Sequence, residues 1–137
     1  MQNDAESGFT LVELLVVLVI LVLLASLIGP RVIGYLGSSR SKSAGVQIQG
    51  LSTSLELYYL DMGRYPSTAE GLAALVEKPP SAATWNGPYL SKQAVPLDPW
   101  GKPYSYEQPG KKARFDLYSL GRDNKEGGTG EDGDLWN

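Results

Sequence analysis

The most strongly patterned part of the chain is an unbroken apolar run near its N-terminus. The run covers residues 9–30, and Glu13 is its only charged side chain. A helix rises about 1.5 Å per residue, so a helix over this run would be roughly 33 Å long and would match the ~30 Å hydrocarbon core of a bilayer. We therefore predict a membrane-spanning helix here.

Helical periodicity continues beyond the apolar run. Apolar residues recur at spacings of three and four along one face, and these are Ile48, Leu51, Leu55, Tyr58, Tyr59 and Met62. Gly63 is a typical residue at a helix end. The pattern predicts one long helix over residues 9–63, with a membrane half at 9–30 and an amphipathic half at 31–63. Proline lacks an N–H group, so we expect Pro30 to loosen or kink this helix.

Short elements are predicted for the rest of the chain, residues 64–137. Ser67 and Glu70 have the spacing of a capping box, which predicts a short helix directly after them. The apolar residues of that helix are Leu72, Leu75 and Val76.

Alternation of period two in residues 104–106 and 115–118 predicts a short antiparallel pair of strands. A domain of this size buries little apolar surface by itself, so we expect residues 64–137 to pack against the second half of the long helix. The predicted fold class is therefore α+β, with a long N-terminal helix packed on a small C-terminal domain.

The composition removes several kinds of chemistry. The 137 residues include no Cys and no His, which excludes disulfide bonds, thiol nucleophiles, Cys-based zinc sites and an imidazole general base. With 12 basic against 15 acidic residues, the chain also lacks the basic surplus that is typical of nucleic-acid-binding proteins. We predict neither an enzyme nor a nucleic-acid-binding protein.

Glu13 is the residue of the apolar run that most needs an explanation. An ionisable side chain inside a bilayer costs about 2.5–3.5 kcal/mol, so it normally has a partner. Gly8 stands before the run, whereas in a secretory signal peptide the small residues follow it. Cleavage after Gly8 would place a new ammonium group on Phe9, about one helical turn from Glu13. An ammonium–carboxylate pair between neighbouring copies could set their register; a plain membrane anchor, the alternative, gives Glu13 no such role.

The segment Gly8-Phe9-Thr10-Leu11-Val12-Glu13 and the apolar run after it resemble the class III signal of type IV pilins and pseudopilins. The resemblance implies that residues 1–8 are a leader, that a prepilin peptidase cuts after Gly8, and that the peptidase methylates the new N-terminus at Phe9. It also implies that Glu13 acts in subunit assembly. The leader here is acidic, whereas the family's leader is usually basic.

Acidic residues and glycines crowd the stretch from 119 to 136. Clustered carboxylates repel one another and glycines add chain entropy, so this stretch would be disordered without a counter-ion. A hard divalent cation such as Ca²⁺ binds carboxylate and carbonyl oxygens, and glycines permit the turns that aim such oxygens inward. From the residues alone, a calcium loop and a solvated acidic tail both remain open.

Four further segments extend the resemblance over nearly the whole chain: YPSTAEGL, WNGPYL, LDPWGKPY and FDLYSLGRDNKEGGTGEDGDLW. These segments are similar to those of the major pseudopilins of the type II secretion system, the general secretion pathway protein G family within the type IV pilin-like superfamily. The resemblance implies a type IV pilin-like α+β fold. It also implies that the C-terminal loop, residues 119–136, holds one structural Ca²⁺ ion.

The calcium ligands that the resemblance implies combine side chains with backbone carbonyls. The candidates are Leu120, Asp123, Glu131, Asp132, Asp134 and Leu135. Asp123 is the principal side-chain ligand, and the two leucines would contribute carbonyl oxygens. The family frequently has Asp where this chain has Gly130, so Glu131 or Asp132 would take its place.

The resemblance also implies a function. The chain would be the major, non-enzymatic subunit of a periplasmic filament, the pseudopilus, whose growth pushes folded proteins across the outer membrane. Before joining this helical homo-oligomer, it would be a single-pass protein of the inner membrane of a Gram-negative bacterium, with its C-terminal domain in the periplasm. The implied partners are the prepilin peptidase, the minor pseudopilins, the inner-membrane assembly platform and, indirectly, the outer-membrane secretin channel.

Two alternatives stay open. One is a type IV pilin of a surface pilus for adhesion, motility or DNA uptake. Many such pilins close their C-terminal region with a disulfide bond, which a chain without Cys cannot form. The other is a membrane-anchored calcium-binding module that never polymerises, for which Glu13 would be an unnecessary cost.

Overall fold

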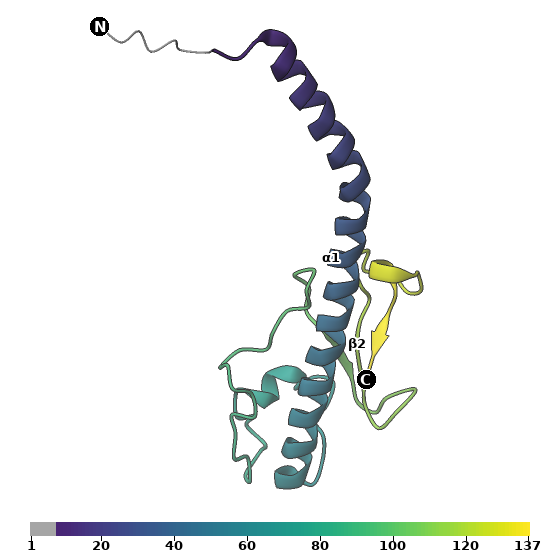
Figure 1. Cartoon of the computed structure of the whole chain (residues 1–137). Coiled ribbons are helices and arrows are strands. Elements are labelled where there is room, and N and C mark those ends of the chain that lie inside the picture. The colour runs from purple at the N-terminus through teal and green to yellow at the C-terminus, as the bar shows by residue number, and fades with distance from the viewer. Residues whose placement is uncertain (1–7) are drawn as a thin grey trace, which may run out of the picture. The chain divides into compact units, whose positions relative to one another are not determined.

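One long helix runs through most of the N-terminal half of the chain. The computed structural model describes residues 8–137, and the helix α1 spans Leu11–Met62 (Figure 1). This confirms the long helix predicted over residues 9–63. Helical structure continues through Pro30, because a single missing N–H group removes one backbone hydrogen bond while those on either side remain. The first seven residues of the predicted leader lie outside the described part of the chain.

The chain divides into two compact units, Met1–Leu36 and Gly37–Asn137. In the first unit, every described residue is exposed except Gly29, which is half-buried. The apolar side chains of this part of α1 therefore have no cover from the described residues of the chain.

The second unit combines the rest of α1 with short elements. These are the 3₁₀ helix η1 (Leu72–Leu75), strands β1 (Ser105–Glu107) and β2 (Asp116–Ser119), the 3₁₀ helix η2 (Gly130–Asp132) and strand β3 (Leu135–Trp136). The strands form one antiparallel sheet in the order β1-β2-β3. Tyr106 faces Leu117 across the first pair, and Tyr118 faces Trp136 across the second. The predicted strand pair is thus confirmed, and β3 is an addition that the sequence pattern did not predict.

The core of the second unit lies between α1, η1 and the sheet. It includes Ile48, Leu51, Leu55, Tyr58, Leu72, Leu75, Tyr106, Phe115 and Leu117. The predicted apolar face of the helix is confirmed, except that Tyr59 is 39% exposed. The Tyr59 ring packs instead on the ring of Tyr65, with 4.7 Å between the ring centres.

The capping box at Ser67 and Glu70 forms, but the element after it is shorter than predicted. The Ser67 N–H donates to the Glu70 carboxylate at 2.7 Å, and the Glu70 N–H donates to the Ser67 hydroxyl at 3.2 Å. Gly71 then adopts a φ of 60°, in the left-handed region that favours glycine. This turn ends the α-helical conformation at once, so only the single 3₁₀ turn η1 follows.

The last residue of the chain extends the sheet beyond β3. The Asn137 backbone N–H donates to the Leu117 carbonyl at 2.9 Å, and the Leu117 N–H donates to the Asn137 side-chain oxygen at 2.8 Å. The Asn137 amide group also donates to the Phe115 carbonyl at 3.2 Å. An asparagine side chain thus supplies the acceptor that a further strand residue would otherwise provide.

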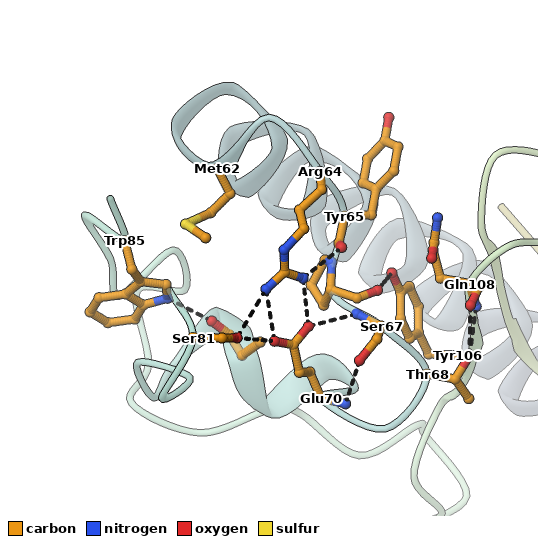
Figure 2. A network of polar contacts seen from close by, with 12 residues as sticks. Met62, Arg64, Tyr65, Ser67, Thr68, Glu70, Ser81, Trp85, Tyr106 and Gln108 are labelled. Carbon is orange, nitrogen blue, oxygen red and sulfur yellow. Dashed lines mark hydrogen bonds and ion pairs between the residues drawn. The ribbon is translucent and has the colours of Figure 1, made fainter. Parts of the chain in front are cut away.

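A polar network joins the residues directly after α1 to the loop that follows (Figure 2). Two Arg64 nitrogens donate to the two Glu70 oxygens at 2.7 and 2.9 Å, and the Ser81 hydroxyl donates to the same carboxylate at 3.3 Å. The hydrogen-bonded Arg64 guanidinium lowers the pKa of Glu70 to about 2. The charged Glu70 is therefore the form that the folded state favours.

We predict that replacing Glu70 with Gln destabilises the second unit by about 1–2 kcal/mol near pH 7, because the bidentate ion pair is lost and its arginine is partly solvated. The folded pKa of about 2 lies below the roughly 4.3 of an unfolded glutamate. The contribution of the pair is therefore complete above about pH 4.3 and is lost as the pH falls through about 2.

Denaturant unfolding of the full chain in detergent at several pH values measures this difference. Glu77→Gln is the matched control, because Glu77 is exposed and makes no ion pair within residues 8–137. If the Glu70→Gln and Glu77→Gln proteins have the same pH profile, the pair does not stabilise the fold.

Candidate assembly site and C-terminal loop

The predicted processing site lies in an exposed, non-helical segment directly before α1. Gly8, Phe9 and Thr10 are outside the helix, and Phe9 is 89% exposed. The Gly8–Phe9 peptide bond is thus accessible in a way that a bond inside a helix is not.

Glu13 has a partner within its own chain. Thr10 precedes the helix as its cap, and Glu13 is the third helical residue. The Thr10 N–H donates to Glu13 Oε2 at 2.9 Å, and the Glu13 N–H donates to the Thr10 hydroxyl at 3.2 Å. This is a capping box, whose sequence signal is a Thr followed three residues later by a Glu. The sequence carries this signal at Thr10 and Glu13, but only the assembly role of Glu13 was predicted from it.

The helix that follows is long and apolar enough, by length and composition, to cross a membrane. The large apolar side chains from Leu11 to Ile28 are all exposed in the chain by itself. Apolar surface on this scale requires cover by lipid or by apolar surfaces of other molecules.

The predicted calcium ligands of the C-terminal loop fall into two groups. Glu131 and Asp132 form the first group, and both pair with arginines. Arg122 Nε and Nη2 donate to the two Asp132 oxygens at 2.9 Å each. Glu131 Oε1 accepts from Arg40 at 3.5 Å and from Trp100 Nε1 at 3.3 Å. The hydrogen-bonded Arg122 guanidinium holds the pKa of Asp132 below its ordinary value.

Asp123 and Asp134 form the second group and fold toward one turn. The Lys125 N–H donates to Asp123 Oδ1 at 3.1 Å, and the Gly127 N–H donates to Asp134 Oδ2 at 3.0 Å. Asp134 Oδ1 is buried and accepts no hydrogen bond from the described residues. This oxygen is an acceptor of the kind that a hard cation prefers.

The two leucines that could contribute carbonyls lie at the two ends of the loop. Leu120 directly follows β2, and Leu135 is in β3, where it faces Ser119. Among residues 8–137, no group of three or more Asp or Glu side chains is placed to hold a metal ion. A calcium site in this arrangement would therefore require backbone carbonyls as well as carboxylates.

Two glycines allow the loop to close on itself. Gly121 has a φ of 68°, and a Cβ atom there would lie 2.5 Å from the Glu131 carbonyl oxygen. Gly128 has a φ of 89°, and a Cβ atom there would collide with the Asp132 backbone. The close approach of the two sides of the loop thus depends on glycine at both positions.

Comparison with known families covers almost the entire chain. Residues 31–137 match the profile of the family described as "Type II secretion system (T2SS), protein G". Residues 3–29 match a "Prokaryotic N-terminal methylation motif". The boundary between the two matches falls within the long helix.

Related proteins match from end to end. The chain is 48% identical to the type II secretion system core protein G of Pseudomonas aeruginosa, with 100% of this chain and 98% of the relative covered. It is 42% identical to the protein of that name from Aeromonas hydrophila (100% and 96% covered) and 41% identical to the one from Vibrio cholerae (96% and 91% covered).

A solved structure has the same fold. The crystal structure of the major pseudopilin from the type 2 secretion system of enterohaemorrhagic Escherichia coli matches with a TM-score of 0.64 and 32% identity. The match covers 77% of this chain and 91% of that chain. Sequence, processing motif and fold agree, and the chain belongs to the type II secretion system protein G family of major pseudopilins.

Proposed function

We propose that this chain is the major structural subunit of a type II secretion pseudopilus. The observation that supports this most directly is the exposed apolar surface of α1, most of which lies within the residues that match the methylation motif. In the inner membrane, lipid would cover this surface. In the filament, the same surface on neighbouring copies would replace the lipid, and the folded second unit would remain in the periplasm.

The capping box of Thr10 and Glu13 fixes the position of the Glu13 carboxylate before assembly. A carboxylate that accepts the Thr10 N–H is partly compensated, which reduces the cost of placing it in the membrane. Cleavage after Gly8 leaves the Thr10 N–H in place and adds a positive charge at Phe9. The ammonium group of a neighbouring copy would then attract Glu13 and align the two helices.

The partners follow from these steps. A prepilin peptidase would act at the exposed Gly8–Phe9 bond, and an inner-membrane assembly platform would collect processed subunits. Minor pseudopilins would join the filament, which would push folded proteins toward the outer-membrane secretin channel. No catalytic step is assigned to this chain.

We predict that Glu13→Leu abolishes filament assembly and protein export while the protein still inserts in the membrane. Leucine favours insertion and removes the acidic partner of the ammonium group. Val12→Leu, in the same helical turn, is the control and should assemble normally. The sedimentable filament fraction, the membrane-bound fraction and export of a folded substrate are measured together. Normal export by the Glu13→Leu protein would refute this role.

We also propose that Asp123 and Asp134 bind one Ca²⁺ ion at the turn formed by residues 123–127. The carbonyls of Leu120 and Leu135 are the candidate backbone ligands. The support is the buried Asp134 Oδ1, for which residues 8–137 supply no hydrogen-bond donor, and the two carboxylates that fold toward the same turn. A bound Ca²⁺ would neutralise these carboxylates and order residues 123–127.

Chelation should therefore lower the Tm of the full chain in detergent by several degrees, because about 1 kcal/mol shifts the Tm of a ~100-residue unit by roughly 4 °C or more. Asp123→Ala should remove most of the difference between calcium and EDTA. Glu77→Ala is the control and should retain it. Equal Tm values of the unaltered protein in calcium and in EDTA would exclude the metal site.

A further inference from the structure

The side chain of Glu131 lies directly against α1 at Gly37. Gly37 is buried, and a Cβ atom there would lie 2.7 Å from both Cγ and Cδ of Glu131. Glycine at this helical position thus creates the space that Glu131 occupies. The 3₁₀ helix η2, which carries Glu131, is docked on α1 through this contact.

Three segments of the second unit hold the Glu131 carboxylate. Arg40 comes from α1, Trp100 comes from the turn before β1, and Arg122 comes from the loop after β2. The Arg122 Nη1–Glu131 Oε2 distance is 3.4 Å, and the Glu131 side chain is 16% exposed. These ion pairs are longer than the roughly 2.7–2.9 Å of strong charge-assisted hydrogen bonds, so burial of the Glu131 side chain against Gly37 contributes to its position together with the three polar contacts.

Arg122 is bonded on both its side chain and its backbone. Its guanidinium makes the bidentate contact with Asp132, and its backbone N–H donates to the Glu131 carbonyl at 2.8 Å. Its own carbonyl accepts from Lys102 Nζ at 2.7 Å. The planar fork of an arginine matches a carboxylate in a way that a lysine does not, so this geometry is specific to the residue.

The charges divide the loop into two halves. In the half next to α1, the carboxylates of Glu131 and Asp132 face the guanidiniums of Arg40 and Arg122. In the other half, Asp123, Glu126 and Asp134 make no ion pair within residues 8–137. The need for an external cation is therefore confined to the second half.

We propose that the guanidinium of Arg122 is the built-in cation of the C-terminal loop. By holding Asp132 and Glu131 it keeps η2 in the position where Glu131 contacts α1 at Gly37 and Arg40, without a metal ion. Calcium would then order only the turn from Asp123 to Gly127. This inference goes beyond the proposed filament function and does not depend on it, because docking of η2 is a property of the single chain. Only the statement about calcium rests on the metal site proposed above.

Amide hydrogen exchange of the full chain in detergent with EDTA tests the proposal. The Arg122 and Asp132 amides report on η2, since they donate to the Glu131 and Thr129 carbonyls. They should be protected in the unaltered protein. Arg122→Gln should reduce their protection at least tenfold, while Lys125→Gln, which removes a positive charge from the same loop, should change it less than twofold.

A glycine pair tests the docking contact without altering any charge. Gly37→Ala should expel the Glu131 side chain and reduce the protection of the Asp132 amide as Arg122→Gln does. Gly45→Ala is the matched control, because within residues 8–137 nothing but its neighbours along the helix lies within 4 Å of a Cβ atom at Gly45. Both alanines favour the helix, so the buried Leu55 amide of α1 should remain protected and shows that the protein is folded.

Two results would overturn the proposal. One is loss of protection of the Arg122 and Asp132 amides when EDTA is added to the unaltered protein. The other is protection within twofold of the unaltered protein in the Arg122→Gln variant, whatever the result for Gly37→Ala. Filament assembly is not a readout here, so its failure would bear on the proposed function alone.

Discussion

The apolar side chains between Phe9 and Leu36 extend in every direction around α1, and the described residues of the chain provide nothing to bury them. A water-soluble monomer with this surface would associate without specificity. Lipid and the helices of other copies are the two covers that suit such a surface, and in the function proposed for this chain one replaces the other.

Several carboxylates in this molecule are fixed by hydrogen bonds or ion pairs, and each has a different partner. Glu13 caps the helix with Thr10, Glu70 binds Arg64 at the end of α1, and Glu131 binds two arginines beside Gly37. Asp134 has one buried oxygen for which the described residues supply no donor. The acids that have protein partners need no metal ion. Asp134 is the exception, and calcium is proposed to bind there. The acidic composition of the loop alone does not distinguish these two situations.

The sequence predicted the elements that depend on local periodicity. The apolar run and its amphipathic continuation predicted α1 to within two residues at either end, and alternation predicted the β1–β2 pair. Strand β3 was not predicted, because two residues are too few for a period and Leu135–Trp136 is a strand only through its pairing with β2. The capping box at Ser67 and Glu70 predicted a short helix after it. The left-handed conformation of Gly71 ends that helix, and only the 3₁₀ turn η1 follows.

In the C-terminal loop, the sequence indicated the acids but not their partners. Arg40 and Glu131 are 91 residues apart in the chain, and only the fold brings them together.

The most direct test of the central claim uses the absence of Cys in this chain, since a single introduced Cys is then the only thiol. Oxidative cross-linking of a Leu18→Cys protein in cells should give covalent dimers. The Leu18→Cys protein that also carries Gly8→Asp, a change intended to prevent cleavage after residue 8, should give none. Monomers alone in both cases, with export intact, would contradict the claim that copies of α1 cover one another.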